Sequence, residues 1–125
     1  MARHFKIWLA VVALIGSSAA TASTYACVGT IDFVSVSPTG VVTVNSQSSG
    51  LGVLFVCQMG TTVNGVSADA CKGILSLLLE AKAIGAQVGW WFNDSIGCSR
   101  TAYFGGNWYW LSDPAGNWYY GPQMQ

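Results

Sequence analysis

The residues best suited to binding chemistry lie in the last third of the chain, where aromatic rings alternate with amides. The segment Gly106–Trp110 (Gly-Asn-Trp-Tyr-Trp) recurs ten residues later as Gly116–Tyr120 (Gly-Asn-Trp-Tyr-Tyr). Asparagine amides make directional hydrogen bonds to hydroxyl groups, and a tryptophan or tyrosine ring can stack on the apolar face of a sugar. The pattern therefore suits a glycan, and it suits a protein partner equally, because Trp and Tyr are frequent interface hot spots.

The same aromatic residues also allow a purely structural interpretation, in which rings pair across strands and stabilise a small sheet. On a strand, residues two apart share a face, as Trp108 and Trp110 would. The adjacent Trp90 and Trp91 would point to opposite faces, one toward the core and the other outward. The candidate ligand-binding residues are Trp91, Asn107, Trp108, Trp110, Asn117, Trp118 and Tyr120.

Groups for acid–base or nucleophilic catalysis are scarce. The single histidine, His4, lies in the leader described below, so a Ser–His or Cys–His pair is excluded from the rest of the chain. Asp32 and Asp94 could meet if the first and fourth strands are neighbours, which keeps a small hydrolase as a third hypothesis, although a solvated surface pair is favoured. No CxxC pair, phosphate loop or calcium loop occurs. We predict no catalytic residue, no metal and no cofactor.

The N-terminus has the order of a secretory signal peptide. Arg3 and Lys6 give a positive start, an apolar run covers 7–16, and small residues follow. That run has about ten residues, well short of the roughly 20 that span a bilayer, so cleavage is favoured over a membrane anchor. We expect cleavage after residue 22, or as late as residue 26, and a secreted or periplasmic product without stable membrane insertion.

The remaining chain, 23–125, is expected to form one domain. It carries three basic residues against five acidic ones, a net charge of −2. This balance provides no electrostatic footprint for nucleic acid and no basic stripe for anionic lipid. We therefore expect a cell-surface glycan or another protein as the partner, and homo-oligomerisation stays open.

Hydrophobic periodicity predicts three strands, a helix and then further strands. Apolar and polar residues alternate over 31–36 and 41–45 around the turn Ser37–Gly40, which indicates a hairpin, and Leu51–Cys57 is a third strand. From Ala68 to Ile84 the apolar spacing is helical. Ser67 and Gly85 suit the two helix caps.

Two further strands are expected after the helix. Gln87–Phe92 is the fourth strand, and 93–97 forms a loop. Thr101–Leu111 is a fifth strand that is broken at its two glycines. The turn signal Asp113–Gly116 then predicts an aromatic hairpin over 101–121, whose two arms are the two copies of the repeat.

This order of elements, β-β-β-α-β-β, is that of a five-stranded OB-like barrel with a helix between its third and fourth strands. Four cysteines in an oxidising compartment are expected to form two disulfides. In the OB layout, the start of strand one meets the segment after strand four, which favours Cys27–Cys98. The end of strand three lies near the first turn of the helix, which favours Cys57–Cys71.

The layout also resembles the B subunits of bacterial AB5 toxins of the subtilase-cytotoxin and typhoid-toxin type. The resemblance covers Cys27–Phe92 and rests on the strand end at Cys57, the helix start Ser67–Cys71, the long helix Ile74–Gly85 and the strand Gln87–Phe92. Small uncharacterised exported proteins of Gram-negative bacteria are similar as well. The resemblance implies an OB fold, a secreted product, ring pentamers and binding of cell-surface glycans that are often sialylated.

Taken together, the sequence favours an exported, non-enzymatic binding protein with a glycan ligand. The alternative is a periplasmic or cell-surface module that binds or inhibits another protein. No residue is assigned to sugar binding from the toxin family, because its sugar-contacting motif has no match here.

Overall fold

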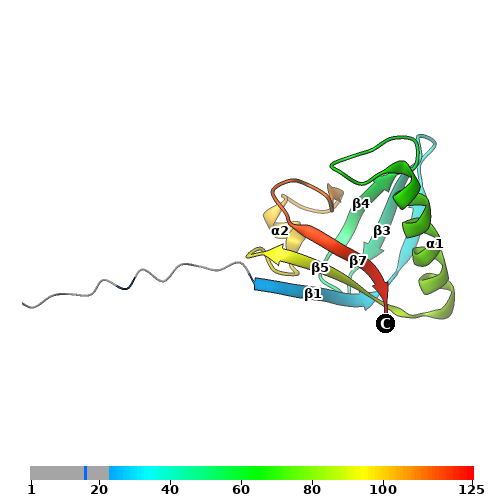
Figure 1. The fold of residues 1–125 in the computed structure, drawn as a ribbon. Helices are drawn as coiled ribbons and strands as arrows, with labels where there is room; N and C mark the ends of the chain where they lie inside the picture. The colour runs from blue at the N-terminus through cyan, green and yellow to red at the C-terminus, as the bar shows by residue number, and fades with distance from the viewer. Residues whose placement is uncertain (1–15, 17–22) are drawn as a thin grey trace, which may run out of the picture.

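The computed structural model describes Gly16 and residues 23–125, so the predicted signal peptide, apart from Gly16, lies outside the described residues. The described domain is mainly β with one long helix, as predicted, and its strands form two sheets (Figure 1). Its elements are, in chain order, β1 (Ser23–Thr30), β2 (Phe33–Val36), β3 (Val41–Ser46), β4 (Gly52–Gln58), α1 (Ala68–Ile84), β5 (Gln87–Asp94), α2 (Arg100–Tyr103), β6 (Tyr109–Trp110) and β7 (Trp118–Met124).

One sheet has the order β1-β5-β7 and the other the order β2-β3-β4-β6. All pairs are antiparallel except β4 and β6, which run parallel. The chain passes between the sheets four times, from β1 to β2, from β4 to β5, from β5 to β6 and from β6 to β7. The described strands do not close into one barrel, so the predicted five-stranded barrel is not confirmed.

The first half of the chain follows the predicted pattern with one addition. β2 and β3 form the expected hairpin, and its turn is closed by a hydrogen bond from Gly40 N to Ser37 O of 2.9 Å. The strand before it is longer than predicted, because β1 begins at Ser23 and pairs with β5 over its full length. A break at Ile31 and Asp32 separates β1 from β2 and turns the chain into the second sheet.

α1 has the bounds that the sequence predicts. The hydroxyl of Ser67 accepts a hydrogen bond from Ala70 N, and Gly85 ends the helix in the left-handed conformation with its N–H bonded to Ala81 O. Cys71, Leu78 and Ala81 form its buried stripe. This stripe packs into the hydrophobic core, and α1 stands at the right of the domain in Figure 1.

Both disulfides have the predicted partners. Cys27–Cys98 joins β1 to the segment after β5, and Cys57–Cys71 joins the end of β4 to the first turn of α1. Trp90 and Phe92 are the largest apolar side chains of the core that they enclose. Two disulfides are typical of an oxidising extracellular or periplasmic environment.

The C-terminal region differs most from the prediction. Residues 100–103 form the short helix α2 instead of a strand, because Arg100 turns inward there and is completely buried. The aromatic hairpin over 101–121 is also wrong. Its turn exists, with Gly116 N bonded to Asp113 O at 2.9 Å, but β6 pairs with β4 while β7 pairs with β5.

Candidate ligand-binding cleft

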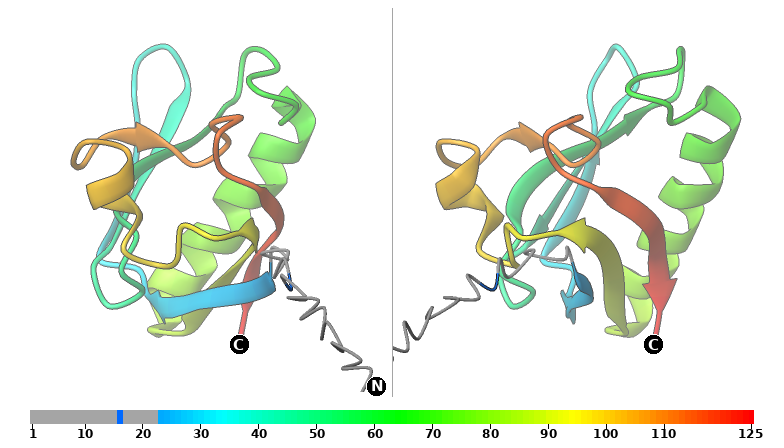
Figure 2. Two further views of the ribbon diagram at one scale, coloured as in Figure 1. Left: turned by 90° about the vertical axis from the view of Figure 1, so that its left-hand side faces the viewer. Right: turned by 60° about the vertical axis from the view of Figure 1, so that its left-hand side comes forward.

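A cleft of about 490 Å³ lies between the loop that precedes α1 and the segment that leads into β7. Its lining residues are Asn64, Gly65, Val66, Ala70, Ser112, Pro114, Gly116, Asn117, Trp118, Tyr119, Tyr120 and Gly121. The second copy of the aromatic repeat therefore forms one wall, and the loop before α1 forms the other. In Figure 2 these segments are the green loop and the orange-to-red segment.

Three consecutive aromatic residues give this wall its character. Tyr119 and Tyr120 are 55% and 58% exposed. Trp118 is half-buried, because its ring packs against Trp90 with 6.1 Å between the ring centroids, and its Nε1 donates to Tyr120 O at 3.0 Å. The wall thus has one ring fixed by the core and two tyrosines that are exposed to solvent.

Amide and hydroxyl groups supply the polar part of the cleft. Asn64 is exposed and stands opposite the aromatic wall. The Nδ2 of Asn117 donates to Asn93 O at 2.9 Å, which fixes the orientation of that amide. The hydroxyl of Ser112 is buried and has no hydrogen-bond partner within the described part of the chain. The exposed amides of Asn64 and Asn117 can hydrogen-bond to the hydroxyls of a ligand that enters the cleft, whereas the buried Ser112 hydroxyl is shielded from it.

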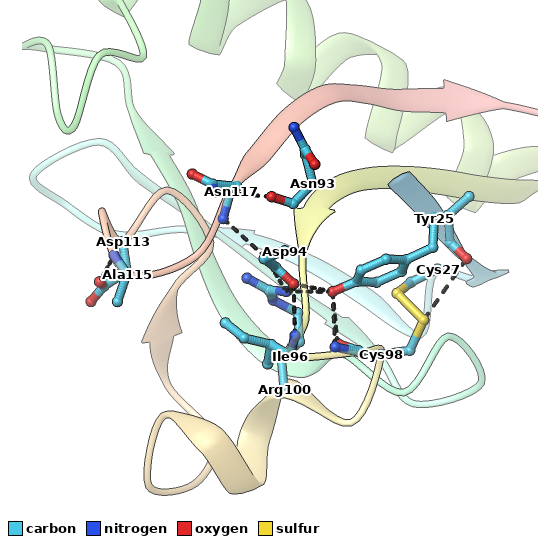
Figure 3. A network of polar contacts seen from close by, with 12 residues as sticks. Tyr25, Cys27, Asn93, Asp94, Ile96, Cys98, Arg100, Asp113, Ala115 and Asn117 are labelled. Carbon is cyan, nitrogen blue, oxygen red and sulfur yellow. Dashed lines mark hydrogen bonds and ion pairs between the residues drawn. A yellow bond between two sulfur atoms is a disulfide. The ribbon is translucent and has the colours of Figure 1, made fainter. Parts of the chain in front are cut away.

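A buried polar network holds the start of the aromatic wall (Figure 3). Asp94, the last residue of β5, accepts hydrogen bonds from the N–H groups of Asn117 at 3.0 Å and Ile96 at 2.9 Å. It also accepts one from the hydroxyl of Tyr25 and forms an ion pair of 3.1 Å with Arg100. The carboxylate therefore ties the N-terminal strand, α2 and the wall of the cleft together.

Arg100 is the cation of this network and is completely buried. Its guanidinium stacks over the ring of Phe92 at 3.9 Å and lies 5.5 Å from the ring centroid of Phe104. A Cβ at Gly116 would collide with Nη2 of Arg100. Only a glycine lets the wall of the cleft approach the guanidinium this closely.

Hydrogen bonding keeps Asp94 ionised. Burial on its own raises the pKa of Asp94, but hydrogen bonds from Tyr25, the amides of Asn117 and Ile96, and Arg100 outweigh burial and lower the pKa to about 2. Burial and the hydrogen bond to Asp94 both raise the pKa of Tyr25. The phenol therefore stays protonated and continues to donate to the carboxylate.

The structure separates the predicted ligand-binding residues into groups. Asn117, Trp118 and Tyr120 line the cleft. Trp108 and Trp110 lie away from the cleft lining and both contact Phe55 of β4. The remaining two residues also lie outside the lining. Asn107 Oδ1 accepts from Val53 N at 3.4 Å, and Trp91 Nε1 donates to Gln123 Oε1 at 3.1 Å.

The residues that the sequence did not reveal are those of the buried network. Asp94 was expected in a solvated loop and is instead the buried end of β5, because Arg100 neutralises it. Tyr25 and Arg100 are 75 residues apart in the sequence, and no motif or periodicity predicts that their side chains meet. Asn64 carried one usable signal, since an Asn-Gly pair marks a turn that can place an amide at the surface.

Neither carboxylate of the hydrolase hypothesis lines the cleft. Asp32 accepts a hydrogen bond from Gln47 N at 2.8 Å, while Asp94 belongs to the buried network. Within the described residues, no three His, Cys, Asp or Glu side chains are grouped so that they could hold a metal ion. None of the helices in this part of the chain is long and apolar enough to cross a membrane.

Comparison with known proteins adds no relative. No protein-family model, curated protein or solved structure matches the chain.

Proposed function

We propose that this chain is an exported, non-enzymatic binding protein whose cleft takes an uncharged carbohydrate. The observation that carries the proposal is the run Asn117–Tyr120, in which an asparagine and three aromatic residues line the same cleft as Asn64. Ring faces suit the apolar side of a sugar, and the amides suit its hydroxyl groups. A small number of oriented polar groups in a largely aromatic cleft is the usual composition of a ligand site.

The charge of the cleft argues for a neutral ligand. None of the described lining residues is charged. A sialylated glycan, which the resemblance to toxin B subunits implies, carries a carboxylate that favours an arginine or lysine partner. Arg100 lies against Gly116 of this wall, but its side chain is fully buried and paired with Asp94. We therefore expect neutral sugars to bind better than sialylated ones.

The lining also argues for binding without catalysis. It contains hydroxyl and amide groups but, among the described residues, no carboxylate, imidazole, thiol or amine. General acid–base catalysis needs a titratable group within hydrogen-bond reach of the substrate. Asp94, which accepts a hydrogen bond from Asn117 N, pairs with Arg100 and does not line the cleft.

Export and the finer fold belong to the same proposal. Two disulfides without a free cysteine in the described chain are consistent with passage through an oxidising compartment. The antiparallel β1–β5 pair and the parallel β4–β6 pair support an OB-like arrangement in which β6 and β7 are two halves of one interrupted fifth strand. The interruption, residues 111–117, is the segment that contributes Ser112 and Asn117 to the cleft.

The proposal is tested by binding of the purified mature domain to a glycan array, followed by calorimetric titration with the best neutral oligosaccharide. Tyr120→Ala removes an exposed ring from the wall and is expected to weaken binding at least tenfold. Asn64→Gly removes the opposing amide at a position with φ of 48°, which glycine adopts readily, and is expected to weaken binding several-fold. Tyr103→Ala is the matched control, because Tyr103 is 58% exposed and lies outside the lining.

Two results would contradict the cleft as a sugar site. One is the lack of signal on any glycan from a correctly folded domain. The other is binding that Tyr120→Ala and Asn64→Gly leave at the level of the Tyr103→Ala control.

A further inference from the structure

We propose that the outer face of β4 and β6 is a second, independent binding surface, formed by Phe55, Trp108 and Trp110, and that it binds an uncharged polysaccharide chain. None of these three residues lines the cleft. The proposal therefore stands or falls separately from the ligand of the cleft.

The three rings are gathered by the parallel pairing of β4 and β6. Phe55 and Trp110 are register partners, and their ring centroids lie 5.3 Å apart. The ring of Trp108 lies 5.8 Å from that of Phe55. Trp108 is 59% exposed, so much of the indole ring faces solvent. Both spacings are those of rings that pack against one another, so the three rings form one continuous aromatic surface.

The backbone of Trp108 is held in a conformation that is rare for a bulky residue. Its φ is 70°, in the left-handed region, where a side chain is strained against its own backbone. The backbone is fastened to β4, since Trp108 N donates to Val53 O at 2.7 Å. If the indole served packing alone, we would expect it to be buried, because burial would offset the energetic cost of this backbone conformation. The structure instead exposes the ring, and strained residues of this kind cluster at functional sites.

The neighbouring residue strengthens the attachment of this loop. Asn107 Oδ1 accepts a hydrogen bond from Val53 N at 3.4 Å, so that Val53 is bonded to the loop through both its N–H and its C=O. A Cβ at position 52 would stand 2.6 Å from Asn107 Oδ1, and Gly52 leaves that space free. The Asn107–Trp108 pair is thus built to hold the indole at one place above the sheet.

The absence of charge on the strands around these rings favours an uncharged ligand. β2, β3, β4 and β6 contain no charged residue. Ser35 is exposed in the same cross-strand row as Phe55, because both pair with Thr43. A face of aromatic rings, a hydroxyl and no charge matches neutral sugars, whose C–H faces stack on rings. A protein interface can share this aromatic, uncharged character at its core, so self-association and partner binding are outcomes that the test below distinguishes.

The test measures retention of the mature domain on three insoluble neutral polysaccharides, cellulose, chitin and curdlan. The wild type is expected to be retained on at least one of them. Trp108→Gly removes the ring and replaces it with the residue that best adopts this backbone, so at least tenfold weaker retention with an unchanged melting temperature is expected. The matched control is Tyr103→Ala, and the cleft variant Tyr120→Ala is expected to be retained like the wild type on the same material.

Four outcomes would overturn the proposal. The first is no retention of the wild type on any of the three polymers. The second is retention that Trp108→Gly does not reduce. The third is a lower melting temperature of Trp108→Gly, which would give the ring a structural role. The fourth is self-association that Trp108→Gly abolishes without any polysaccharide retention, which would identify a protein interface instead. Retention lost only in Tyr120→Ala would assign the polymer to the cleft.

Discussion

At the scale of single residues, Asp94 has the greatest influence on the candidate cleft. Its carboxylate receives hydrogen bonds from the side chain of Tyr25 and from the backbone of Ile96 and Asn117, and it pairs with the buried Arg100. Asn117 is the first residue of the aromatic wall. The position of the wall therefore depends on the carboxylate of Asp94, which lies outside the cleft lining.

This arrangement predicts that stability depends on pH in the acid range. The folded pKa of Asp94 is about 2, below its ordinary value of 3.8. The ionised form is thus favoured by folding, and the corresponding stabilisation of about 2 kcal/mol is fully present above pH 4. It is lost as the pH falls from about 4 to about 2. Urea unfolding at pH 7, 4, 3 and 2 measures this loss.

Asp94→Asn and Asp69→Asn provide the comparison. Asp94→Asn leaves Arg100 buried without its anion, and it should lower the free energy of unfolding at pH 7 by about 3–5 kcal/mol. Asp69 is exposed, with Lys72 Nζ 3.8 Å away, so Asp69→Asn should change stability by less than about 1 kcal/mol. An acid-induced loss of equal size in Asp94→Asn and in the wild type would contradict the assignment.

At the scale of elements, the sequence predicts those parts whose signals are local. The bounds of α1 follow from Ser67, the helical spacing of its apolar residues, and Gly85, all of which act within a few residues. The hairpin of β2 and β3 follows in the same way from its turn. The turn at Asp113–Gly116 is also real, and Asp113 Oδ1 accepts from Ala115 N at 2.8 Å as expected for such a turn.

The predicted pairing of the strands on either side of that turn was wrong, because β6 pairs with β4 and β7 pairs with β5. A turn signal fixes a local reversal of the chain but does not determine which sheet the next strand joins. Here residues 111–117 carry the chain from β4's side to β5, where Trp118 pairs with Phe92. Likewise, the strand propensity of Thr101–Phe104 is overridden, because burial of Arg100 over Phe92 requires a helical turn there.

Both disulfides were predictable because the order of elements constrains which chain ends meet. Their loops differ in length, with a sequence separation of 71 for Cys27–Cys98 and 14 for Cys57–Cys71. Removing either bridge increases the conformational entropy of the unfolded chain, and the resulting loss of folding stability grows with the length of the loop. We predict that Cys27→Ala/Cys98→Ala costs about 4.4 kcal/mol and Cys57→Ala/Cys71→Ala about 3 kcal/mol.

Urea unfolding of the two double variants at pH 7 measures these costs. The informative quantity is their order, since each double variant removes two sulfurs. A larger cost for the Cys57–Cys71 variant would show that anchoring α1 in the folded state outweighs the restriction of the unfolded chain.

At the scale of the whole molecule, the candidate site could be predicted only in part. Trp118, Tyr120 and Asn117 were identifiable from the repeat, because aromatic and amide residues at strand spacing are unusual. Their separation from Trp108 and Trp110 was not, because it depends on β6 and β7 entering different sheets. The two copies of the repeat thus occupy two distinct surfaces rather than the two arms of one hairpin.

The start of β1 bears on which of the two predicted cleavage sites is used. Cleavage before Ser23 would leave all of β1, whose register with β5 runs from Ser23–Asp94 to Thr30–Gln87. Cleavage before Cys27 would remove half of that strand together with Tyr25, which donates to Asp94. The unpaired end of β5 and the altered carboxylate would both destabilise the domain. We therefore predict that the mature protein begins at Ser23.

Intact-mass measurement of the protein exported from a Gram-negative host would identify the first residue. A form engineered to begin at Cys27 is expected to melt several degrees below the form that begins at Ser23, since each 1 kcal/mol shifts the melting temperature by about 4–8 °C in a domain of this size. Tyr25→Phe in the longer form separates the two contributions, because it removes the hydroxyl but keeps β1. Export as the Cys27 form with an unchanged melting temperature would show that residues 23–26 are dispensable, and that Asp94 is held in place by Arg100 and the backbone of Asn117 alone.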